Sequence, residues 1–199
     1  MPITIKSERE IELMTEAGRI LGIVHKELEK ALKPGMSTLD IDALGEEVIR
    51  SYGCEPSFLN YNGYPASICV SVNDEIVHGI PSAKHLIKEG DIVSLDAGVI
   101  YKGYHSDAAR THAVGEIRPD LQKLIDVTRE SFFEGIKFAK EGNHLYDISR
   151  AIGDYAESFG YGVVRELCGH GIGTSLHESP EIPNFQMRRR GPQPKAGMT

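Results

Sequence analysis

Two aspartates in the middle of the sequence are spaced so that a β-hairpin would bring them together. They are Asp96 and Asp107 in "DIVSLDAGVIYKGYHSDAARTHAVG", which reads as two strands joined by a turn at Lys102-Gly103. A two-residue turn there pairs Asp96 with Ala109 and Gly98 with Asp107. Because residues two apart on a strand share a face, both carboxylates point the same way, about 7–8 Å apart at the backbone.

Such a carboxylate pair has two interpretations. In a mostly apolar strand environment the two negative charges repel, and burying them without compensation is costly. A bound cation would remove both problems. Alternatively the strand ends are exposed and water solvates both side chains. The two aspartates alone leave both interpretations open.

Three histidines add a second kind of metal ligand. His170 lies between glycines in "CGHGIGTSLHESP", His177 follows in the same stretch, and His78 lies in the Gly/Pro-containing connection "NDEIVHGIP". Flanking glycines let backbone and ligand approach closely. One imidazole and two carboxylates would form a mixed nitrogen and oxygen site, suited to Mn, Fe, Co or Zn. A single histidine would more simply be a surface or structural residue, but the set favours convergence on one cleft.

Composition and motif searches exclude several other classes. The 199 residues carry a formal net charge of −7 and are 40% hydrophobic, which argues for a globular domain and against general nucleic-acid or membrane binding. H-E-x-x-H, P-loop and G-x-S-x-G motifs are all missing from the sequence. The three cysteines, with no C-x-x-C pair, predict buried free thiols in a reducing cytoplasm.

Hydrophobic periodicity predicts the elements that must position these residues. We expect a long helix within residues 7–35, a shorter helix from Ser37 to Gly53, strands from Glu55 to Gly115, a helix from Pro119 to Lys140 and a short helix over residues 145–159. The order of long helix, short helix and strands then begins again. The sequence therefore predicts an internal duplication.

An offset of 107 residues aligns the two copies. It superimposes Gly35 on Gly142, Asp40 on Asp147 and Gly53 on Gly160, and it brings "KEGDIV" at Lys88 onto "KAGMT" at Lys195. We expect one domain of two halves, about 1–115 and about 116–199. The counterpart of Asp96 would lie just after Thr199, so the second hairpin is expected to be missing and the domain incomplete at its C-terminus.

Taken together, these stretches resemble the bacterial type I methionine aminopeptidases. The markers are "YNGYPASICVSVNDEIVHGIP", "DIVSLDAGVIYKGYHSDAARTHAVG" and "CGHGIGTSLHESPEIPNF", in this order and at this spacing. The resemblance implies an α/β (α+β) pita-bread fold, in which two pseudo-two-fold-related halves surround an antiparallel sheet.

The resemblance also implies residue roles. Asp96 resembles a ligand of one metal, Asp107 a carboxylate bridging two, and His170 an imidazole ligand of the other. His78 and His177 resemble the two catalytic histidines that contact substrate. The residues that match the methionine pocket are Phe58, Tyr61, Tyr64, Cys69 and Leu176, for which ordinary core packing is the alternative.

The implied reaction is hydrolytic removal of the N-terminal methionine from nascent polypeptides whose second residue is small. Two divalent ions (Co, Mn, Fe, Zn or Ni) would be the cofactors, in a cytoplasmic monomer without nucleic-acid or membrane partners and with association to the ribosome as a further expectation. The family carries two more glutamate ligands, which this sequence lacks. A truncated, non-catalytic homologue that binds peptide or a partner protein is therefore the alternative, and a creatinase- or prolidase-like peptidase is a third option.

Overall fold

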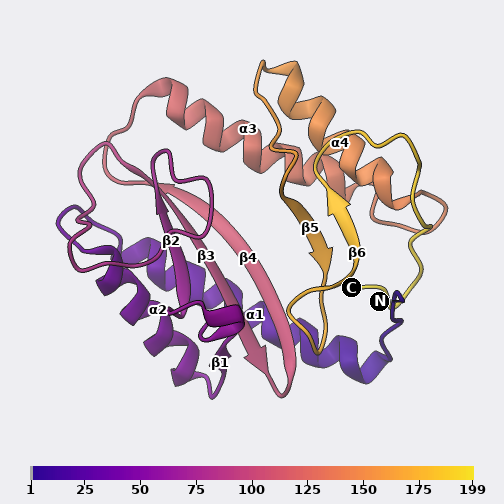
Figure 1. Ribbon diagram of the computed structural model, residues 1–199, viewed down its shortest axis with the longest axis horizontal. Coiled ribbons are helices and arrows are strands. Elements are labelled where there is room, and N and C mark those ends of the chain that lie inside the picture. Colours follow the sequence, from indigo (N-terminus) through magenta and orange to yellow (C-terminus); the bar gives the residue numbers. More distant parts are fainter. Residues whose placement is uncertain (1) are drawn as a thin grey trace. The chain divides into compact units, whose positions relative to one another are not determined.

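The computed structural model describes residues 2–199, and its elements follow the predicted order closely (Figure 1). The helices are α1 (Glu8–Ala31), α2 (Thr38–Ser51), α3 (Pro119–Ile136) and α4 (Leu145–Ser158), with a short 3-10 helix, η1 (Tyr61–Gly63). The strands are β1 (Glu55–Pro56), β2 (Ile68–Val72), β3 (Ile92–Tyr101), β4 (Tyr104–Ala113), β5 (Cys168–Gly171) and β6 (Glu178–Pro183). No helix within residues 2–199 is long and apolar enough to cross a membrane.

The chain folds as two compact units. The N-terminal unit comprises Glu10–Leu121 and Gly173–Leu176. The C-terminal unit comprises residues 2–9, Gln122–Ile172 and His177–Thr199. Each unit is described by itself below.

The N-terminal unit is a sheet with one apolar face. Its central strand β3 pairs antiparallel with β1, β2 and β4. One face carries alternate apolar residues of β2 and β3, and these pack with the buried faces of α1 and α2 into one hydrophobic core. The main members are Ile20, Leu21, Val24, Leu28, Ile41, Ile49, Ile68, Val70, Val72, Val93, Leu95, Ala97 and Val99.

The opposite face of this sheet is polar, and the β3–β4 hairpin has the predicted register. Asp96 pairs with Ala109 and Gly98 pairs with Asp107. The turn residues Lys102-Gly103 both have positive φ, +49° and +85°, as a type I′ hairpin turn requires. The prediction that both carboxylates lie on one face is confirmed.

The C-terminal unit contains α3, α4 and the two-stranded sheet β5–β6. Two predictions need correction here. The predicted helix to Lys140 ends at Ile136, and turns continue through Phe138 and Ala139. The sequence also gave no location for the second set of strands, because β6 contains Pro180 and Pro183, which argue against a strand.

The local geometry repeats at the predicted offset. Helices α2 and α4 begin and end 107 residues apart. In each, an aspartate of the first turn accepts a hydrogen bond from the backbone N–H that precedes the helix, Asp40 from Ser37 (2.8 Å) and Asp147 from His144 (2.9 Å). The bond from Thr38 N–H to the His85 carbonyl (2.9 Å) likewise has a counterpart at the same offset, of 2.8 Å.

The C-terminal residues are the structural copy of the turn before β3. Gly90 and Gly197 have φ of +90° and +88°. The bond from Asp91 N–H to the Lys88 carbonyl (3.2 Å) recurs 107 residues later at 3.1 Å. Thr199 therefore has the position that the first residue of β3 has in the first copy.

The cysteines partly differ from expectation. All three are free thiols, and Cys54 and Cys69 are buried as predicted. Cys168 at the start of β5 is exposed, so the prediction of three buried thiols was wrong for this residue.

Candidate active site

The carboxylate pair lies on the polar face of the N-terminal unit, among residues that match the predicted pocket. Cys69 of β2 is the direct cross-strand neighbour of Asp96. A β-carbon on Gly98 would lie 2.6 Å from Ser57 Cβ and 2.9 Å from Phe58 Cε1. Because Gly98 shares the face of the aspartates, the 57–58 segment packs on that same face.

The pKa shifts agree with this arrangement. Burial raises the pKa of the Cys69 thiol to about 11, and the negative charges of Asp96 and Asp107 add to the effect, against a hydrogen bond with Tyr64 that lowers it. Burial also raises the pKa of the Tyr64 phenol. Cys69 is therefore a neutral thiol near neutral pH and does not act as a nucleophile.

The predicted pocket residues differ in exposure. Phe58, Cys69 and Leu176 are buried, Tyr64 is half-buried, and Tyr61 is exposed in the η1 turn. The Tyr64 hydroxyl lies 3.1 Å from the carbonyls of both Ile68 and Gly79. The five belong to one unit, although Leu176 comes from a distant part of the sequence.

His78 is exposed on a loop that is fixed to β2. Its φ of +58° is uncommon for a residue with a side chain. The next residue, Gly79, exchanges hydrogen bonds with β2, donating to the Ser71 hydroxyl and accepting from Val70 N–H, both at 3.0 Å. A β-carbon on Gly79 would collide with the Val70 carbonyl oxygen, so only glycine permits this approach.

In the C-terminal unit His170 and His177 lie side by side. Their ring centroids are 4.1 Å apart. His170 Nδ1 lies 2.9 Å from the Gly171 carbonyl oxygen, which can only accept, so the proton is on Nδ1. The lone pair of the neutral ring is then on Nε2, the arrangement in which a backbone carbonyl orients a metal-binding histidine.

The N-terminal segment braces the strand that follows His177. The Lys6 ammonium forms a nearly buried ion pair with Glu178, with side-chain exposures of 6% and 11%. The hydroxyl of Thr4 also donates to Glu178, at 3.1 Å. Since an ion pair removed from water holds its partners in a narrow geometry, this contact restrains the residue next to His177.

The donor chemistry fits a divalent metal. Carboxylate oxygens and a neutral imidazole nitrogen are ligands of Mn, Fe, Co and Zn. Across residues 2–199 no three His, Cys, Asp or Glu side chains form a group that could hold a metal by themselves. The evidence for metal binding is therefore the carboxylate pair and the tautomer of His170.

His105 is a feature that the sequence prediction missed. It lies on β4 opposite Ile100 and shares the face of Asp107, two residues further along. Its Nδ1 forms a 3.0 Å hydrogen bond with the Ser57 hydroxyl. The hairpin register alone placed this side chain beside Asp107, so the alternation along β4 was the signal that could have found it.

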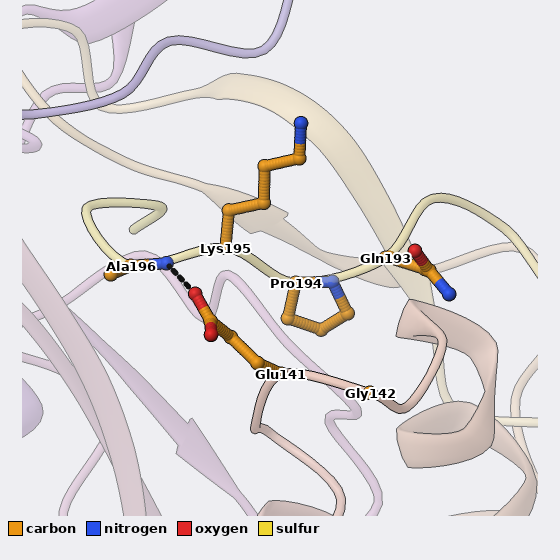
Figure 2. Close-up of a pocket in the computed structure, with 6 residues that line it drawn as sticks. All are labelled: Glu141, Gly142, Gln193, Pro194, Lys195 and Ala196. Carbon is orange, nitrogen blue, oxygen red and sulfur yellow. Dashed lines mark hydrogen bonds between the residues drawn. The ribbon is translucent and has the colours of Figure 1, made fainter.

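A pocket in the C-terminal unit lies elsewhere. It is lined by Glu141, Gly142, Gln193, Pro194, Lys195 and Ala196. Figure 2 shows Glu141 accepting a hydrogen bond from Ala196 N–H (3.1 Å), with the Lys195 side chain extending away from Glu141. In the first copy the corresponding corner is closed by Gly35 N–H bonded to the carbonyl of buried Ile87 (2.9 Å). None of the predicted site residues lines this pocket.

Comparison with known proteins identifies the class. Residues 12–199 match metallopeptidase family M24. The chain is similar to a methionine aminopeptidase of Clostridium acetobutylicum, with 54% identity over 98% of this chain and 78% of that protein. A crystal structure of a Thermotoga maritima methionine aminopeptidase superimposes with a TM-score of 0.96 at 41% identity, over 99% of this chain and 79% of that one. A Bacillus anthracis Xaa-Pro dipeptidase gives 0.82 at 30% identity and is covered over only 52% of its chain.

The chain therefore belongs to metallopeptidase family M24 and has the pita-bread fold. Within that family it belongs to the methionine aminopeptidases. It is a metal-dependent exopeptidase, and the comparisons support this function rather than the non-catalytic alternative.

Proposed function

We propose that the chain removes the N-terminal methionine from polypeptides whose second residue is small. Asp96 and Asp107 hold the metal cofactor with His170, and His78 and His177 contact the substrate. The observation that carries this proposal is the pair of aspartates on the polar face of the β3–β4 hairpin. The high identity to methionine aminopeptidases supports it.

Each residue has a distinct task. When bound, the metal supplies Lewis-acid polarisation of the peptide carbonyl and activation of a water. Asp96 and Asp107 neutralise its charge, and Asp107 bridges two ions. His177 donates a hydrogen bond to the carbonyl oxygen of the scissile bond, where negative charge develops. One such donor typically contributes about 3–4 kcal/mol to the stabilisation of the transition state.

Phe58, Tyr61, Tyr64, Cys69 and Leu176 bind the methionine side chain. A thioether is polarizable and packs well against aromatic rings and a neutral thiol. The buried positions of Phe58, Cys69 and Leu176 support an apolar pocket. The raised pKa of Cys69 supports an uncharged wall at neutral pH.

Several finer features belong to the same proposal. Two divalent ions occupy the site, drawn from Co, Mn, Fe, Zn or Ni. Residues 1–199 form one catalytic domain of two halves. The protein is a cytoplasmic monomer that associates with the ribosome. Size-exclusion chromatography, metal analysis and co-sedimentation with ribosomes test these statements separately.

Peptide hydrolysis tests the activity. We expect the purified protein with added Mn²⁺ or Co²⁺ to release methionine from Met-Ala-Ser and to leave Met-Leu-Ser nearly intact. Asp107→Asn should abolish turnover and weaken Mn²⁺ binding measured by calorimetry. The proposal is wrong if Asp107→Asn binds Mn²⁺ as tightly as the unaltered protein.

A further inference from the structure

His105 is well placed to organise the predicted methionine pocket, because two segments that carry pocket residues are hydrogen-bonded to it. Its side chain bonds to the Ser57 hydroxyl at 3.0 Å. Its backbone N–H donates to the Gly173 carbonyl at 2.8 Å. Ser57 precedes Phe58, and Gly173 begins the short segment that ends at Leu176.

The Ser57 end of this link is buried and fixed. Ser57 is 4% exposed, and its N–H donates to the Gly98 carbonyl of β3 at 3.0 Å. The segment is thus fixed by its backbone to β3 and by its side chain to β4. A buried hydroxyl that loses its partner is destabilising, so the bond to His105 selects one position for Ser57 and hence for Phe58.

The Gly173 end is a short irregular segment. Residues Gly173–Leu176 are grouped with the N-terminal unit, and Leu176 is 3% exposed. Gly173 N–H donates to the Ser175 carbonyl at 3.1 Å, which closes a tight turn. Because this segment belongs to no strand, its placement depends on individual bonds such as the one from His105.

We infer that His105 is a positioning residue for methionine recognition, which sets the distance between Phe58 and Leu176 by linking their segments to β4. This inference rests on the proposed function. It predicts that loss of the His105 side chain weakens binding of the methionine side chain more than it slows the chemical step, because His105 acts through Phe58 rather than on the reacting atoms.

The test combines binding of free L-methionine by calorimetry with hydrolysis of Met-Ala-Ser. His105→Ala should raise the Kd for methionine and the KM about tenfold, equivalent to about 1.4 kcal/mol, and leave kcat within about twofold. His105→Asn, whose amide can reproduce the bond to Ser57, should recover most of the affinity. Ser57→Ala should match His105→Ala, and the double variant should be no weaker than either single variant.

Thr111→Val is the matched control. Thr111 lies on the same strand and face as His105, and its hydroxyl forms a 2.8 Å bond with Ser94. Its removal should leave Kd and KM unchanged. If His105→Ala does not fold, Ser57→Ala and His105→Asn still decide the question.

The possible failures are distinguishable. If the unaltered protein neither binds methionine nor cleaves Met-Ala-Ser, the proposed function fails and this inference fails with it. If the unaltered protein binds methionine and the His105 and Ser57 variants bind it equally well, only the inference is overturned. Additive losses in the double variant, or a fall in kcat at constant KM, would also overturn it.

Discussion

Gly98→Ala is the smallest change that tests the geometry of the polar face. The new β-carbon would lie 2.6 Å from Ser57 Cβ and 2.9 Å from Phe58 Cε1. Ordinary contacts between carbon atoms are about 3.5–4.0 Å, so one partner must move by roughly 1 Å. Strand β3 is paired along both edges and cannot move easily, so the 57–58 segment is the part that shifts.

This shift has a structural and a functional consequence. Overpacking of this kind costs typically about 1–3 kcal/mol in the free energy of unfolding. For a chain of 199 residues that corresponds to a fall in Tm of roughly 2–12 °C. Because Phe58 moves with the segment, the KM for Met-Ala-Ser should rise by about tenfold or more, with a smaller change in kcat. Thermal unfolding and steady-state kinetics measure the two effects.

Gly18→Ala is the control. Gly18 lies in α1, and no atom would come within 4 Å of its new β-carbon. Alanine is the better helix former, so this variant should gain roughly 0.5–1 kcal/mol and keep its KM. If Gly98→Ala has the stability and KM of the unaltered protein, the packing of the 57–58 segment on the aspartate face is refuted.

Three further predictions follow from buried or strained positions. Burial lowers the pKa of His25 below 6.5, so the unfolded chain binds more protons below that pH and stability falls on acidification; His25→Gln should reduce this loss, at most about 1.4 kcal/mol per pH unit, while His85→Gln should not, as urea titrations at pH 7.5 and 5.5 would show. Cys69→Ala should raise KM but keep kcat within about threefold, whereas a large loss of kcat would contradict the neutral thiol. Gly197→Ala should lower Tm more than Gly90→Ala, because its β-carbon would meet Ile5 and the Lys6 carbonyl at 2.7 Å, whereas at Gly90 the nearest atom is 3.8 Å away.

The parts of the site that the sequence predicted depend on local periodicity. The turn at Lys102-Gly103 fixes the register of β3 and β4, and the register fixes the shared face of Asp96 and Asp107. The same reasoning applies to the helices α2 and α4, whose caps and glycines are local signals. These features were predictable because each depends on residues only a few positions apart.

Contacts between distant segments were not predictable in this way. The bonds from His105 to Ser57 and Gly173 join residues that no turn or period relates. Strands β5 and β6 were missed because glycine and proline, which normally argue against strands, are required here by a close backbone approach. A β-carbon at Gly171 would lie 2.6 Å from the Ser179 carbonyl oxygen. The residue that breaks the sequence pattern is the one that permits the His170 strand to form.

The duplication explains why two kinds of ligand occur in one fold. Backbone features recur at the same offset, including the positive φ of Gly90 and Gly197 and the turns that contain them. The bond from Asn73 N–H to the Ile92 carbonyl (2.9 Å) after β2 also has a counterpart after β5, where Ile172 N–H donates to Thr199 (3.3 Å). Side chains on this shared frame have diverged, with carboxylates on the first copy and imidazoles on the second. Selection for a backbone frame preserves glycines and caps, whereas selection for a mixed nitrogen and oxygen donor set favours different side chains in each copy.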